Sequence, residues 1–127
     1  MSRAAAKKED GVRAHDLHIE IVQGMPVVVL HEFDGTLASD LSPDVIIEHK
    51  PAATIQSVAT NHPPHVPHSG AFQKEPRNEG TVVTGAAAVL VNHKPLARDG
   101  DRVLTCNDPM NLPVGVISAF GTVKVGG

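Results

Sequence analysis

The chain has 127 residues, a formal net charge of −3 and three aromatic side chains, all phenylalanine. This length indicates one domain, and the weak acidity with so few aromatic residues to stack on bases argues against nucleic-acid binding. No apolar run approaches the roughly 20 residues that a membrane helix needs, and a single cysteine excludes an internal disulfide. Abundant valine, with 11 glycines and 10 prolines, predicts an all-β chain of short strands and many turns.

The first segment of the chain differs from the rest in lacking apolar periodicity. Residues 1–14 are small and charged and are predicted to form a flexible tail, so the folded β domain is expected to span residues 15–127. Residues 18–30 predict two strands joined by a turn at 23–26, and residues 32–41 predict a polar loop. Further strands are expected at 44–48, 81–84, 89–91, 102–105, 114–118 and 122–125, the last two as a closing hairpin.

An internal repeat links two parts of the chain. The segment 45–53, VIIEHKPAA, aligns with the segment 89–97, VLVNHKPLA, at an offset of 44 residues. Continuing this register places His62 opposite Cys106, each eleven residues beyond the proline of its unit. Each unit predicts a strand, a tight turn and a return strand. Two weaker copies are indicated, at 21–26 and, truncated, at 122–127.

The unit that begins at Val89 resembles a PAAR repeat. In that family the unit runs strand, Asn-Gly, a variable residue, Pro-Ala-Ala-Arg, a variable residue, Gly-Asp and then Cys or His. The matching positions are Pro95, Ala97, Arg98, Gly100, Asp101 and Cys106 in this unit, and Pro51, Ala52, Ala53 and His62 in the preceding one. The sequence departs from the pattern at His49 and His93, which replace the turn glycine, and at Thr54 and 56–57, which replace Arg and Gly-Asp. The resemblance covers about residues 42–127.

This resemblance implies both a fold and a function. PAAR proteins are small cones of β-hairpins about a pseudo-three-fold axis, with a metal held near the vertex by histidine and cysteine. The resemblance implies a monomer that caps the trimeric β-helical spike of a contractile injection system, such as a type VI secretion system or a phage-tail-like particle, and can carry effectors. Such a tip is assembled in the bacterial cytoplasm, is exported with the particle and contacts the target membrane transiently. It is not an enzyme, and its metal is structural zinc, with iron as the alternative.

The metal ligands that the sequence offers are Cys106 and three histidines of a proline-rich loop, His62, His65 and His68. Structural zinc binds four nitrogen or sulfur ligands of this kind in a tetrahedron. In polyproline II geometry the three histidines share one face, but the outer two lie about 19 Å apart. A four-ligand site therefore requires a turn near residues 64–66, or a replacement ligand, for which His31 is the best candidate.

Two other functions fit the same histidines. A small cupin-like β-barrel enzyme would use His31 with the histidine loop around an open metal, and a generic metal-binding module would use the loop without catalysis. No carboxylate falls at the short spacing from a ligand pair that such enzymes use. Coordination separates these alternatives, because a closed four-ligand site is structural whereas catalysis needs an open position.

Overall fold

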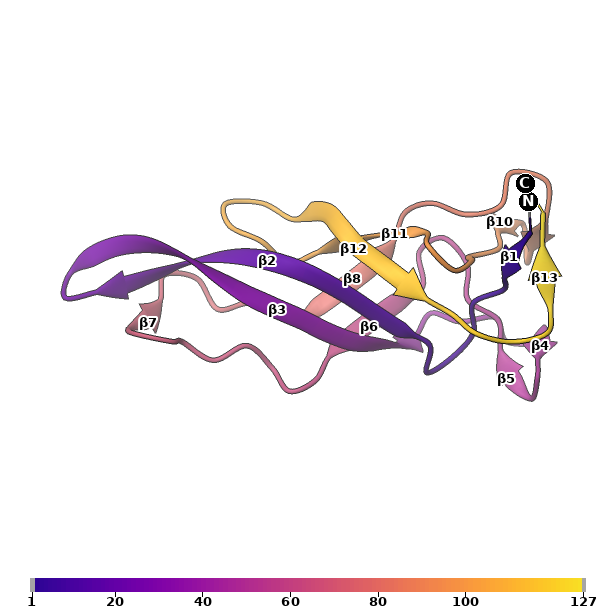
Figure 1. Cartoon of the computed structure of the whole chain (residues 1–127), viewed down its shortest axis with the longest axis horizontal. Helices are drawn as coiled ribbons and strands as arrows, with labels where there is room; N and C mark the ends of the chain where they lie inside the picture. Colours follow the sequence, from indigo (N-terminus) through magenta and orange to yellow (C-terminus); the bar gives the residue numbers. More distant parts are fainter. Residues whose placement is uncertain (1, 127) are drawn as a thin grey trace.

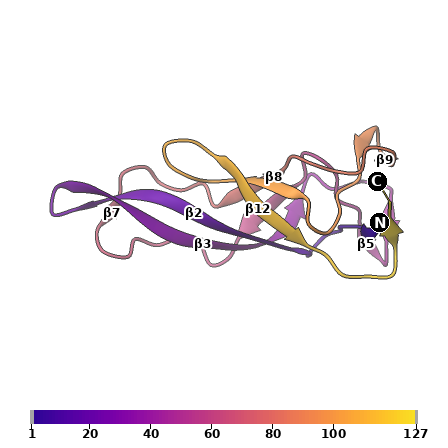
Figure 2. The same ribbon diagram turned by 45° about the horizontal axis from the view of Figure 1, so that its top comes forward.

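The computed structural model describes residues 2–126, and strands are the regular elements in that range. They are β1 (Arg3–Ala4), β2 (Gly11–Val22), β3 (Met25–Ser39), β4 (Ile46–Ile47), β5 (Lys50–Pro51), β6 (Val58–Asn61), β7 (Ala71–Phe72), β8 (Glu79–Val82), β9 (Leu90–Val91), β10 (Lys94–Pro95), β11 (Arg102–Thr105), β12 (Leu112–Ser118) and β13 (Lys124–Val125). The molecule is elongated, with the β2–β3 hairpin and β7 at one end and the short strands β1, β4, β5, β9, β10 and β13 at the other, here called the base (Figure 1). Figure 2 shows the same arrangement after a turn of 45°. The described chain holds no helix long and apolar enough to cross a membrane.

Six strands form a closed barrel in the order β2, β3, β6, β8, β11 and β12, and the pairing of β12 with β2 closes it. The longest pairing joins β2 to β3, from Gly11 opposite Thr36 to Val22 opposite Met25. The turn between these strands is at 23–24, where both residues have positive φ angles of 50° and 78°, as two-residue hairpin turns require. The predicted strand–turn–strand is therefore confirmed, with strands longer than expected.

Three two-stranded ribbons, β4–β5, β9–β10 and β13–β1, make up the base; they are called the base ribbons below. Their registers match one another. Ile46, Leu90 and Lys124 occupy the same position, each opposite the second residue of its partner strand. The third ribbon joins the two ends of the described chain, so the base is closed by a contact between its first and last strands.

A ring of backbone hydrogen bonds joins the three units at their centre. The amide of Ala6 donates to the carbonyl of Ala97 at 2.9 Å, that of Ala97 donates to Ala53 at 2.9 Å, and that of Ala53 donates to Ala6 at 3.0 Å. All three alanines are fully buried. The chain therefore has an internal three-fold arrangement of hydrogen bonds, although the three sequences differ.

Each unit continues into a tight turn that is closed in the same way. A backbone amide donates to a side-chain oxygen three residues later, in the pairs Lys7 and Asp10, Thr54 and Ser57, and Arg98 and Asp101. The third residue of each turn has a positive φ of 76° to 84°, and only in the third unit is it a glycine, Gly100. Glycine adopts this conformation without the steric cost that other residues bear.

The N-terminal segment was predicted to be a flexible tail, and this prediction is wrong. Ala4, Ala5 and Ala6 are buried, and residues 3–10 form the unit equivalent to 50–57 and 94–101. The weaker repeat copy expected at 21–26 lies instead in the β2–β3 hairpin. The truncated copy at the C-terminus does belong to the repeat, because β13 supplies the strand that pairs with β1.

Two further differences concern strand pairing. The predicted polar loop at 32–41 is mostly strand, because β3 continues to Ser39 and its residues alternate between buried and exposed. The expected closing hairpin does not form, since β12 pairs with β11 and β2 whereas β13 pairs with β1. Both differences arise because the partners of these strands are distant in sequence, and local pattern carries no information about them.

The barrel interior changes from apolar to ionisable along its length. On β2 the inward positions nearest the base are Val12 and Ala14, and those farther along are Asp16, His18 and Glu20. On β3 the inward residues pass from Leu37 and Phe33 to His31 in the same direction. The part of the barrel farther from the base is thus filled with groups that need polar partners when they are buried.

Candidate metal centre

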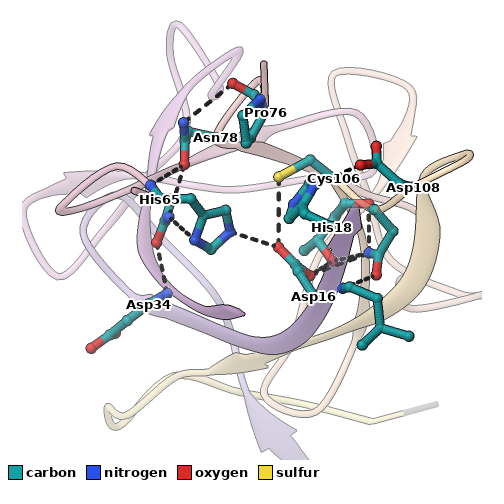
Figure 3. A network of polar contacts seen from close by, with 12 residues as sticks. Asp16, His18, Asp34, His65, Pro76, Asn78, Cys106 and Asp108 are labelled. Atoms are coloured by element: carbon teal, nitrogen blue, oxygen red, sulfur yellow. Dashed lines mark hydrogen bonds and ion pairs between the residues drawn. The ribbon is translucent and has the colours of Figure 1, made fainter. Parts of the chain in front are cut away.

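Four side chains with metal-binding atoms meet inside the barrel, here called the inner group: Asp16, His18, His65 and Cys106. The atoms that they offer all lie within 4.8 Å of one another. β2 supplies Asp16 and His18 on its inward face, Cys106 follows β11 directly, and His65 lies in the loop after β6. Figure 3 shows these side chains pointing toward one another from three separate segments.

The Asp16 carboxylate connects the group. One of its oxygens accepts hydrogen bonds from the Thr105 hydroxyl at 2.6 Å and the Asn107 amide at 3.3 Å. The other oxygen lies 3.2 Å from Nε2 of His65 and 3.6 Å from Sγ of Cys106. Asp16 is fully buried, so its contacts fix the positions of two potential ligands at once.

His18 is the least satisfied residue of the group. Its side chain is 1% exposed, and neither ring nitrogen has a hydrogen-bond partner among residues 2–126. The nearest acid, Asp108, lies 3.6 Å from Nδ1. Burial lowers the pKa of His18, and Asp108 only partly opposes this effect. A neutral imidazole with free nitrogen atoms is the form that binds metals, and an unmet polar atom of this kind costs about 1–3 kcal/mol.

Cys106 has the environment of a neutral thiol when no metal is bound. Burial, together with the neighbouring charge of Asp16, raises its pKa to about 11. A coordinated divalent cation deprotonates a thiol outright. The buried Cys106 therefore differs from a reactive surface thiol, and metal binding there releases a proton.

The inner group offers two nitrogen atoms, one sulfur and one oxygen, which is a complete tetrahedral set. Zinc binds all three kinds of atom at about 2.0–2.3 Å, and thiolate with imidazole favours zinc or iron over magnesium or calcium. The unpartnered nitrogens of His18 are the observation that fits an ion best, because nothing else among residues 2–126 uses them. The chain thus has a possible metal site at the polar end of its barrel.

A second set, here called the outer group, lies beside the first and consists of Glu20, His31 and His68. Nε2 of His31 is 2.7 Å from the Glu20 carboxylate. Glu20 also accepts hydrogen bonds from the backbone amides of His68, Ser69 and Gly70 at 3.0–3.3 Å. One carboxylate on β2 therefore orients a ring of β3 and anchors the histidine loop.

The four ligands expected from sequence do not share one site. His65 and Cys106 meet in the inner group, while His68 belongs to the outer group and His62 is exposed and belongs to neither. His31, the expected replacement, lies in the outer group, with its ring centroid 5.2 Å from that of His65. Sequence reasoning missed Asp16, His18 and Glu20, although their spacing of two residues is what one face of a strand requires.

Comparison with known proteins adds no assignment. No protein-family model, curated protein or solved structure matches this chain.

The outer group makes the stability of the metal-free chain depend on pH. Burial opposes ionisation of Glu20, but the amides of Ser69, His68 and Gly70 and the His31 ring outweigh it and lower the pKa from 4.5 to about 2. The stability that Glu20 contributes is thus fully present above pH 4.5 and is lost as the pH falls toward 2. With EDTA present, we expect the free energy of unfolding, measured with urea, to fall more steeply over this pH range for the parent than for Glu20→Gln. If the free energy of unfolding depended on pH in the same way for both proteins, Glu20 would not be the group responsible.

Proposed function

We propose that this chain is the tip of the central spike of a contractile injection system, seated by its base on a trimeric β-helical spike protein. The observation that carries the proposal is the ring of hydrogen bonds among Ala6, Ala53 and Ala97. It makes a single chain three-fold at the end where the three base ribbons lie (Figure 1). The PAAR resemblance supports the same function from the sequence. Carriage of effectors and export at the particle tip belong to this proposal.

Symmetry is the physical reason for this partner. A three-fold partner presents three identical edges, and a monomer can contact all of them alike only if its own surface repeats three times. The base ribbons offer such a surface, because each presents the same strand positions to solvent. Short unpaired ribbon edges are also the kind of surface that another β-structure covers by adding strands or loops.

The exposed side chains of the base are of the kind that a binding partner covers. Ile46 and Leu90, which are equivalent, are 57% and 60% exposed. The third equivalent position is Lys124. Exposed apolar residues at matching positions indicate an interaction surface when they occur together. The β13–β1 ribbon, with Lys124 at this position, departs from strict repetition, so the base also has a means of choosing one orientation on its partner.

The inner group has a structural role in this proposal. In the part of the barrel far from the base, the interior holds ionisable residues instead of an apolar core. A bound ion joins β2, the histidine loop and the end of β11, so its binding energy becomes folding energy. Zinc is the ion that the proposal favours, with iron as the alternative.

Substitutions at opposite ends of the molecule test the docking surface. The double variant Ile46→Asp, Leu90→Asp places two charges in the proposed interface. We expect it to bind the spike trimer of the organism that makes the chain at least tenfold more weakly, since burying unpaired charges is costly. The matched control is Val28→Asp on β3, whose side chain is 64% exposed in the projecting hairpin. Biolayer interferometry on the immobilised trimer measures both affinities.

The outcome of this comparison is decisive when all variants keep the circular dichroism spectrum of the parent. Loss of binding in the base variant alone supports seating by the base. Equal affinities in the two variants, or a larger loss for Val28→Asp, would contradict it.

A further inference from the structure

We propose that the outer group, Glu20, His31 and His68, is a second metal site that is open to solvent and exchanges its ion readily. The proposal concerns metal binding alone and does not rest on the spike-tip function. It accounts for His68, a histidine of the loop motif that the inner group does not use.

The geometry of the outer group suits a transition-metal ion. Its three side chains offer atoms within 4.8 Å of one another. Two imidazoles and one carboxylate form a set that binds zinc or ferrous iron and leaves coordination positions for water. Nε2 of His31 and the Glu20 carboxylate are 2.7 Å apart, so these two atoms already face each other closely enough for one ion to bind both.

Charge also favours a cation at this place. Glu20 is 0% exposed, and among residues 2–126 the titratable side chain that pairs with it is His31. Apart from His31, the partners of this carboxylate are the backbone amides of His68, Ser69 and Gly70, which carry no full positive charge. Buried charges are normally paired or bound to metals, and a divalent cation completes the compensation here.

A surface groove gives the outer group access to solvent. It has a volume of about 330 Å³, and its lining includes His31, His62, His65 and His68. His68 is exposed, whereas Glu20 and His31 are buried. An ion can therefore reach His31 through the groove without opening the barrel. Because His65 of the inner group also lines the groove, the same opening leads toward the inner site.

The two sites are expected to differ in affinity. The outer group has three ligand side chains and no sulfur, whereas the inner group has four with a cysteine. The ring centroids of His31 and His65 are 5.2 Å apart, so the two sites are neighbours and two divalent ions bound there repel each other. The inner site therefore fills first, and the outer site binds its ion more weakly.

Titration with Co²⁺ distinguishes the sites because thiolate coordination gives a charge-transfer band in the near ultraviolet and nitrogen or oxygen coordination does not. For the metal-free parent we expect two equivalents, the first with the thiolate band and the second with visible absorption only. His68→Ala is expected to keep the first equivalent unchanged and to weaken the second by about tenfold or more. The matched control is His62→Ala, which removes an exposed histidine of the same loop that belongs to neither group.

Several results would overturn the proposal. A parent that binds one equivalent, lost in both His31→Ala and Cys106→Ala, would merge the two groups into a single site. A His68→Ala variant that binds both equivalents like the parent would exclude the outer group. Equal weakening of the second equivalent in His62→Ala would place that ion elsewhere on the loop. His68 is exposed, so its variant is expected to keep the parent's melting temperature without metal.

Discussion

With free Zn²⁺ buffered at about 1,000 times its Kd for the inner group, the chain is expected to melt about 16 °C above the metal-free protein. A ligand at this concentration stabilises the folded state by about 4.1 kcal/mol. For a domain of this size, 1 kcal/mol moves the melting temperature by about 4 °C. The ion acts strongly because it joins three segments that contact one another through few apolar side chains in this part of the barrel.

Replacing Cys106 by serine separates the contribution of the metal to stability from the contribution of side-chain packing. The change removes the sulfur ligand but keeps nearly the same volume, so Cys106→Ser is expected to lose most of the zinc-dependent shift. In EDTA the variant and the parent are expected to melt within about 4 °C of each other, which corresponds to about 1 kcal/mol. Differential scanning calorimetry with and without zinc measures all four values. A variant that keeps the full shift, or a parent that zinc does not stabilise, would show that the inner group holds no structural ion.

Asp101→Ala is expected to lower the free energy of unfolding by about 3–5 kcal/mol, because it leaves the buried Arg98 guanidinium without its partner. Asp101 accepts bonds from the backbone amide and the side chain of Arg98 at 2.7–3.1 Å, and from the Thr84 hydroxyl at 3.0 Å. The amide contact closes the turn of the third unit. The side-chain contacts neutralise a cation that is 8% exposed.

The equivalent position in the second unit gives a matched comparison. Ser57 accepts the amide of Thr54 at 3.0 Å and closes the same turn without any charge. The Ser57 hydroxyl also donates to the Asp40 carbonyl at 2.8 Å. Ser57→Ala leaves these two neutral groups unpaired and is expected to cost about 1–3 kcal/mol, less than the loss of a buried ion pair. Urea unfolding of both variants measures the difference. Equal losses in the free energy of unfolding would mean that closing the turn stabilises the fold and that the ion pair adds nothing.

The repeat could be predicted only where its sequence is conspicuous. The units at Lys50 and Lys94 share His-Lys-Pro, and their registers agree in the structure. The unit at Arg3 has neither proline nor histidine, and its run of alanines followed by charged residues is also typical of a mobile tail. Its role depends on β13, more than a hundred residues away, and on burial of three alanines that have little apolar character of their own.

The residue types of the candidate metal site could be predicted from the sequence, but their positions only in part. The repeat register pairs His62 with Cys106, whereas the structure brings His65 to Cys106 and leaves His62 outside both groups. Asp16 and His18 come from β2, where alternation can show which residues share a face but not which other segment that face meets. The histidine loop also bends around Glu20, whose carboxylate accepts hydrogen bonds from three successive amides. Residue spacing within the loop does not predict this contact, because Glu20 lies on a different strand.

The central claim is that one chain with an internal three-fold base seats on one three-fold spike. Native mass spectrometry of the complex with the spike trimer of the same organism tests this claim most directly, because it counts the chains. The account predicts a complex of one tip chain and three spike chains, unchanged when the tip is in excess. Three tip chains on each trimer, or no complex between folded partners, would contradict it.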